Sequence, residues 1–422
     1  MISWIDALPM AEGRASPLDN PQLNLNDPES WRLIFGDEYS SKSGVTVTPS
    51  TALSYSAVYS AVALISGDVA KLPLNVYRRR PDISPNAREV DRGHPAQFLV
   101  RREANRFTTA FEFWRRVMSH LLIWSNAYVW IERDENGRLV GLWPLLPDRT
   151  QVEDVEGEPW IVTETNQRLE PLPPSSVLHF QGLTVAGRGE CELIQKARNS
   201  WGLGLAAENF AARFFKNGGR VGGILELPAG MPKQARDVAE TGFRKTYEGP
   251  DAAFRTFVAR EGIKFHEAQM NAKDTQLGES RRESIRDVAR WYNLPIHKLG
   301  DGSNTSYNSL EQENRSYLNG CLSHWLATIS SQCNLKLLTR VEKQSDSVFF
   351  EHNTDALLAT DTKTRTEVAV MEIQNRIMSP NEYRDKTNRP PYAGGDTYAN
   401  PNVTPGEAGE ESSEANRAEV YK

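Results

Sequence analysis

The segment DTQLGESRRESIRDVARWY, residues 274–292, decides the arrangement that we expect for this chain. At roughly 100° per residue, it predicts a helix with three distinct faces, closed by Pro295. The basic face carries Arg282, Arg286 and Arg290. The acidic face beside it carries Glu279, Glu283 and Asp287. The far side is apolar and carries Leu277, Ile285, Val288, Ala289 and Tyr292.

Two interpretations of the charged faces are open. Each acidic residue precedes an arginine by three positions, which is typical of a solvated face with weak intrahelical ion pairs. Alternatively, the two stripes contact the same helix in neighbouring copies, as a head-to-tail ring requires. The spacing alone favours the solvated face.

Other blocks surround this helix in a recognisable order. A long helix is expected over 192–216, ended by Asn217-Gly218-Gly219. A compact insert follows, with a strand at 221–227, a helix at 232–247 and a pair of strands at 254–259 and 263–267. After residue 292 come a loop of small polar residues at 300–306 and a third long helix over 308–338. A short strand at 349–351 and helices at 361–376 and 380–384 complete the chain.

The N-terminal half mixes helices with short strands. Val58, Val62, Ile65 and Val69 recur at helical spacing and predict a helix over 54–72, followed by a strand at 73–80. A helix over 109–123 has Thr108 or Thr109 as its cap. Asn136-Gly137 joins strands at 126–133 and 138–146 in a hairpin. Strands at 150–155, 160–163 and 176–181 complete one small sheet, so the fold class is α+β and mainly helical.

Composition bounds the function. The net charge of −6 is unlike that of a protein that grips DNA by its phosphates. Cys191, Cys321 and Cys333 are too few and too widely spaced for a disulfide framework. We find no signal peptide in residues 1–20 and no apolar run long enough for a membrane span. We therefore expect a soluble protein made in a cytoplasm.

The motif search gives no catalytic residue, no cofactor and no metal site. A phosphate loop and a Gly-x-Ser-x-Gly elbow are both absent. His266-Glu267 lacks the second histidine of a zinc protease and lies in a predicted strand. Gly202 and Gly204 lie inside a helical pattern, where they permit close packing instead of binding a dinucleotide. We expect His179 to lie in a strand and His324 in the core.

The order of blocks and many short motifs resemble the bacteriophage portal protein family of long-tailed phages, from about residue 50 to residue 400. The motifs in the first half are SAVYSAVALIS at 56–66, LPLNVY at 72–77, His94-Pro95, TAFEF at 109–113, NAY at 126–128, LWPL at 142–145 and VLH at 177–179. Those in the second half are AARFFKNG at 211–218, PIHKLG at 295–300, SLEQEN at 309–314, SPNEYR at 379–384 and Pro390-Pro391 before GGD at 394–396.

The resemblance implies a portal-type subunit with named parts. A flexible segment (1–45) precedes a wing (46–196) of helices and a small sheet. A two-helix stem (197–217 and 274–294) encloses a small α/β clip (218–268). A tunnel loop (298–308) leads to a long helix and wing return (309–356), helical crown (357–393) and disordered acidic tail (394–422).

The function implied is a virion component: a ring of about twelve copies at one capsid vertex, through which double-stranded DNA passes non-specifically. Its implied partners are the terminase large subunit, the major capsid protein and a head–tail adaptor. The tunnel loop would line the channel with Lys298, Ser303, Asn304, Thr305 and Ser306, and the stem stripes would serve the subunit interface or channel wall. Two rivals stay open: another head–tail connector or capsid component, and a packaging nuclease using Asp355 and Asp361.

Overall fold

The computed structural model describes residues 40–354 and 362–398, except 83, 85–86, 166–167, 184–191, 217–222, 228–231, 248–263, 268–272, 301–313 and 388. The chain divides into two compact units, with the boundary between Thr354 and Asp355. Within the described residues, no helix is long and apolar enough to cross a membrane.

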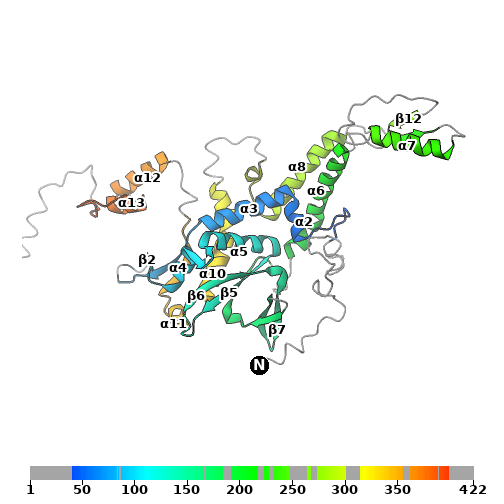
Figure 1. Cartoon of the computed structure of the whole chain (residues 1–422). Helices are drawn as coiled ribbons and strands as arrows, with labels where there is room; N and C mark the ends of the chain where they lie inside the picture. Colours follow the sequence, from blue (N-terminus) through cyan, green and yellow to red (C-terminus); the bar gives the residue numbers. More distant parts are fainter. Residues whose placement is uncertain are drawn as a thin grey trace, which may run out of the picture. The chain divides into compact units, whose positions relative to one another are not determined.

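Two helices form the centre of the first unit (Figure 1). α3 (Ser56–Lys71) follows the short α2 (Pro49–Ser54) and packs against α5 (Ala110–Trp124). The four residues that predicted the first helix, Val58, Val62, Ile65 and Val69, are all buried. Thr109 caps α5 in a reciprocal capping box with Glu112, which confirms the predicted start of that helix.

A three-stranded antiparallel sheet joins distant parts of the sequence. β1 (Leu74–Arg79) lies between β2 (Arg88–Val90) and β13 (Val348–His352). The register places Val76 opposite Phe350, and both side chains are buried. β13 therefore brings the chain that follows the third long helix back beside β1.

The predicted hairpin is confirmed. β5 (Asn126–Arg133) and β6 (Leu139–Leu145) pair antiparallel, and Gly137 has the positive φ of 77° that their turn requires. β10 (Val177–Gln181) pairs with the other edge of β5 and contains His179, as expected.

The expectation of a single small sheet is wrong. β7 (Thr150–Val155), β8 (Glu158–Thr165) and β9 (Arg168–Leu172) form a sheet of their own, separate from β10–β5–β6. The two sheets meet through a buried cluster of Tyr128, Ile161 and Val177. A pattern of short strands predicts strands, but the pairing between them depends on side-chain contacts distant in sequence.

A small region between β2 and α5 was not predicted. It contains α4 (Pro95–Arg101), β3 (Glu103–Asn105) and β4 (Thr108–Thr109). α4 begins with His94 as N-cap and Pro95 at its first position, an arrangement that favours helix initiation. Its apolar residues Ala96, Leu99 and Val100 are buried.

The two long helices appear where the sequence places them. α6 (Glu192–Lys216) has the predicted bounds, and α8 (Lys273–Trp291) ends ahead of Pro295. Between them, β11 (Gly223–Glu226) pairs antiparallel with β12 (Lys264–Glu267), and α7 (Lys233–Tyr247) lies between these strands in sequence. β12 was expected to pair with 254–259, which lies outside the described residues; its partner here is β11.

The third long helix is described from residue 314 and is interrupted. Residues 318–322 form a π-helical turn, labelled η7, and α10 (Ser323–Lys336) follows. Cys321 and Cys333 are buried, but His324 is exposed, so its placement in the core was wrong. The unpredicted α11 (Arg340–Ser345) begins with a capping box of Thr339 and Glu342.

The second unit contains α12 (Thr362–Gln374) and α13 (Pro380–Lys386), close to the predicted bounds. Ser379 caps α13 in a capping box with Glu382. Asn381 holds the following turn by accepting the backbone N–H of Tyr392 and donating to the carbonyl of Tyr392, both at 3.0 Å.

Candidate functional site

α6 and α8 run side by side and antiparallel (Figure 1). Ser200 of α6 donates to Asp287 of α8 at 3.2 Å, and further along Glu208 lies 3.8 Å from Arg281. At the base of the pair, Trp201 stacks on Tyr292 with ring centroids 6.0 Å apart. Polar links at the sides and buried aromatic rings at the base hold the two helices together.

The glycines of α6 permit close packing, as the sequence indicated. A Cβ on Gly204 would lie 2.8 Å from the ring of Tyr55, and one on Gly202 would lie 2.4 Å from the Oγ of Ser41. Burial and the nearby carboxylate of Glu208 raise the pKa of Tyr55. Gly204 thus brings α6 onto the junction between α2 and α3, which also contacts α8.

The charged stripes of α8 form local ion pairs. Arg286 pairs with Glu283, and Arg290 pairs with Asp287 at 2.5 Å and with Glu283 at 3.7 Å. These are the i, i+3 pairs of the solvated-face interpretation. Asp287 is partly turned toward α6, where it accepts from Ser200, so the acidic stripe does not lie on one outward face.

The charged residues in the first half of α8 are paired differently. Arg282 and Glu279 are exposed, and neither makes an ion pair within the described part of the chain. Arg281, which sequence analysis did not select, bridges to Glu208 instead. Its role was hidden because it falls on the apolar side of the helix, away from both charged stripes, and only the position of α6 reveals it.

The predicted loop begins at a defined point after α8. η6 (Ile296–Leu299) ends in Gly300, whose φ of 89° suits a glycine C-cap. Lys298 donates to Asn314 at 3.0 Å and lies 5.2 Å from the ring centroid of Tyr317. The two sides of segment 301–313 are therefore tied together. The loop residues Ser303, Asn304, Thr305 and Ser306 lie outside the described residues.

Buried groups fix the far side of this loop. The Tyr317 hydroxyl donates to Asp68 of α3 at 3.2 Å, and burial together with Asp68 raises the pKa of Tyr317. In the π-helical turn, Cys321 donates to the carbonyl of Tyr292 at 3.3 Å, and burial raises its pKa to about 12. Asn293 donates to the carbonyl of Gly320 at 2.5 Å. The π turn thus packs directly on the end of α8.

Nothing in the described residues forms a metal site: no group of three or more histidine, cysteine, aspartate or glutamate side chains converges there. Asp355 and Asp361, the acid pair of the nuclease alternative, lie outside the described residues. His266 and Glu267 lie in the strand β12.

Residues 56–388 match the family model described as phage portal protein. The chain belongs to the phage portal protein family. It is 29% identical over 416 residues to the probable portal protein of Streptomyces phage phiC31, covering 93% of this chain and 88% of that protein. It is 27% identical over 347 residues to the portal protein of Enterobacteria phage HK97, covering 82% and 81%. Its function is therefore that of a phage portal protein.

Solved structures share the fold. An HK97 family phage portal protein from Corynebacterium diphtheriae superposes with a TM-score of 0.55 at 21% identity, covering 75% of this chain and 98% of that one. A chain in the neck of a native gene transfer agent particle, computed with C12 symmetry, gives a TM-score of 0.51 at 15% identity, covering 88% and 96%. The expected fold class, a portal-type α+β subunit, is thereby confirmed.

Proposed function

We propose that copies of this chain assemble into a closed ring of about twelve subunits whose axial channel conducts double-stranded DNA. The observation that carries the proposal is the portal family match across residues 56–388, combined with an antiparallel α6–α8 pair that keeps charged residues on its outer side. In this proposal α6 and α8 are the stem, and 218–268 is the clip.

The tunnel loop is proposed to be the segment held by the Lys298–Asn314 clamp. Because Lys298 is engaged at 3.0 Å by Asn314 and lies against Tyr317, it anchors the loop instead of offering a free cation to DNA. The remaining loop residues are small, polar and mostly uncharged, which suits a surface past which DNA must slide.

The proposed partners follow from this arrangement. The clip would bind the terminase large subunit and later the head–tail adaptor, and the wing would contact the major capsid protein within the virion. The ring would assemble in the host cytoplasm. We propose no catalytic role for the chain, in keeping with its two relatives, which are named portal proteins.

The ring is tested by native mass spectrometry and negative-stain microscopy of the purified full-length chain. We expect channelled rings at micromolar concentration; a population of monomers and dimers alone contradicts the proposal.

Deleting Gly302–Thr305 should leave the rings intact, because the Lys298–Asn314 clamp is retained, yet impair DNA packaging. Full DNA packaging by that deletion variant would contradict the proposal that this loop lines the channel.

A further inference from the structure

A short stretch of the wing is strongly basic although the whole chain is acidic. Residues 92–116 contain six arginines, no lysine and two glutamates, a formal net charge of +4 in a chain of −6. All six arginines are exposed. We call them the arginine surface: Arg92, Arg101, Arg102, Arg106, Arg115 and Arg116.

These arginines have no carboxylate partner in the described part of their own chain. The neighbouring β1–β2 sheet is different, because Arg78, Arg80 and Arg88 there all form ion pairs. Arg92, Arg101 and Arg102 instead line an open cleft of about 1010 Å³ together with Phe98, whose side chain is 52% exposed. Guanidinium groups bind carboxylates through two parallel hydrogen bonds, so this surface is suited to an acidic protein face.

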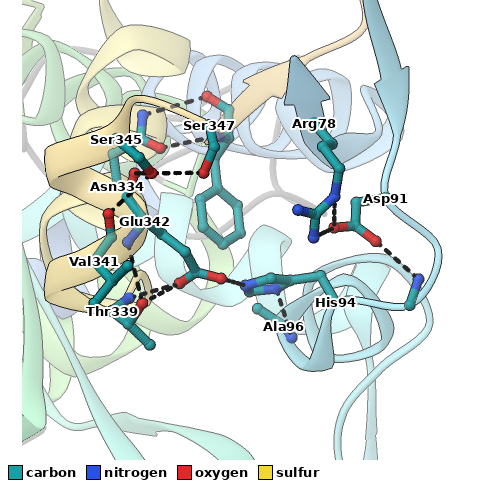
Figure 2. A network of polar contacts seen from close by, with 12 residues as sticks. Arg78, Asp91, His94, Ala96, Asn334, Thr339, Val341, Glu342, Ser345 and Ser347 are labelled. Atoms are coloured by element: carbon teal, nitrogen blue, oxygen red, sulfur yellow. Dashed lines mark hydrogen bonds and ion pairs between the residues drawn. The ribbon is translucent and has the colours of Figure 1, made fainter. Parts of the chain in front are cut away.

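The helix that presents Arg101 and Arg102 is held firmly (Figure 2). His94 Nδ1 accepts the backbone N–H of Ala96 at 3.2 Å, so the ring proton lies on Nε2, which faces Glu342 Oε1 at 3.3 Å. Glu342 is itself fixed by the backbone and hydroxyl of Thr339. α4 is therefore anchored to α11 through its N-terminus.

A complementary surface lies elsewhere on the same chain. Residues 150–172, which form β7–β9, contain six acidic residues and one arginine, a net charge of −5. Ile161, Val152 and Leu172 share the face that packs on Tyr128 and Val177. Strand alternation places three glutamates on the opposite face. We call them the acidic face: Glu153, Glu158 and Glu164.

The two surfaces do not meet within one subunit. None of the acidic-face glutamates forms an ion pair in the described part of the chain. Figure 1 shows α4 and β7 on different sides of the β5–β6 hairpin. A positive surface and a negative surface on different sides of one subunit suit a head-to-tail contact between copies.

We infer that the arginine surface of one subunit binds the acidic face of a second copy in the assembled ring. This inference rests on the proposed ring and names the contact that closes it at the wing. Exposed Phe98 and Phe107 beside the arginines favour a protein partner, because aromatic residues and arginine are enriched in the centres of protein interfaces. A DNA-binding role for the arginines would leave the acidic face, which repels DNA, without a partner.

The test uses two charge-reversal variants of the full chain. Variant one is Arg101→Glu with Arg102→Glu, and variant two is Glu153→Lys with Glu158→Lys. Each variant alone places like charges at every contact, so it should form no ring. Native mass spectrometry measures this at about 0.15 M salt, where charges within roughly 8 Å of each other still interact. Mixed in equal amounts, the two should form rings that contain both subunits in alternation, because every contact then joins opposite charges.

The control is Arg138→Glu with Arg340→Glu, a matched reversal at two exposed arginines outside both surfaces, which should assemble like the unaltered chain. Recovery in the mixture cannot arise from misfolded subunits. Failure of the mixture to recover, or rings from either variant alone, overturns the inference while leaving the ring proposal intact. The inference is also overturned if variant one still assembles into rings but loses affinity for a labelled DNA duplex. Absence of rings from the unaltered chain would instead overturn the proposed function.

Discussion

At the scale of single residues, this fold depends on places where a side chain would not fit. Gly204 is the clearest, because a Cβ there would come within 2.8 Å of the Tyr55 ring. The ring cannot withdraw without disturbing the junction of α2 and α3, where Tyr55 caps α3 and is 3% exposed.

We therefore predict that Gly204→Ala lowers the free energy of unfolding by about 1–3 kcal/mol, the usual cost of overpacking a close contact. The matched control is Gly67→Ala in α3, where a Cβ would meet nothing within 4 Å. That change should raise stability by about 0.5–1 kcal/mol, because alanine is the better helix former. Urea unfolding measures both, and equal effects of the two substitutions would show that the Tyr55 contact is unimportant.

At the scale of elements, α8 has two sides with different tasks. Its inner side buries Val288 and Ala289, and Asp287 accepts a hydrogen bond from Ser200 of α6. Its outer side carries Arg286 and Glu283, an exposed pair of the kind that contributes about 0–1 kcal/mol to stability. Stability and assembly should therefore respond to different positions on the same helix.

Arg286→Glu should reduce the ring population strongly while the unfolding midpoint of the subunit stays almost unchanged. Val288→Ala should do the reverse, lowering the free energy of unfolding by about 1–2 kcal/mol through loss of buried methyl groups. Native mass spectrometry and urea unfolding of both variants give the comparison. If Arg286→Glu unfolds like Val288→Ala while its rings persist, the outer side of α8 has no role in assembly.

At the scale of the whole subunit, one buried histidine and two half-buried ones link the fold to pH. Burial lowers the pKa of His120, His179 and His352 to about 4. His179 hydrogen-bonds Asn126 at 2.9 Å and stacks on Tyr128, and His352 hydrogen-bonds Ser330 at 3.1 Å. These rings are neutral in the folded chain over a range where the unfolded chain, with a histidine pKa near 6.5, already binds protons.

The sign follows from proton binding. Between about pH 6.5 and 4 the unfolded state binds more protons, so stability should fall as pH falls through that window and stay level above it. We predict a melting temperature lower by roughly 5 °C or more at pH 5 than at pH 7.5. His179→Gln, which keeps a donor for Asn126, should reduce the difference. A pH-independent melting temperature over this range would contradict the neutral state of these rings in the folded chain.

The sequence by itself determined the elements whose signals are local. α6, the capped start of α5, and the β5–β6 hairpin with Gly137 appear where they were predicted, since caps, periodicity and turn residues act within a few positions. The family resemblance was also readable, because it rests on short motifs in a fixed order. The stem and loop roles stay predictions.

Only the tertiary structure decided how distant segments meet. It pairs β1 with β13, separates β7–β9 from the central sheet, turns Asp287 toward α6, and joins His94 to Glu342. It also leaves the arginine surface and the acidic face unpaired on different sides of one subunit, although their charges can be counted in the sequence. The physical reason is that pairing, burial and the direction of a side chain depend on residues far away in the chain, whereas periodicity and caps do not.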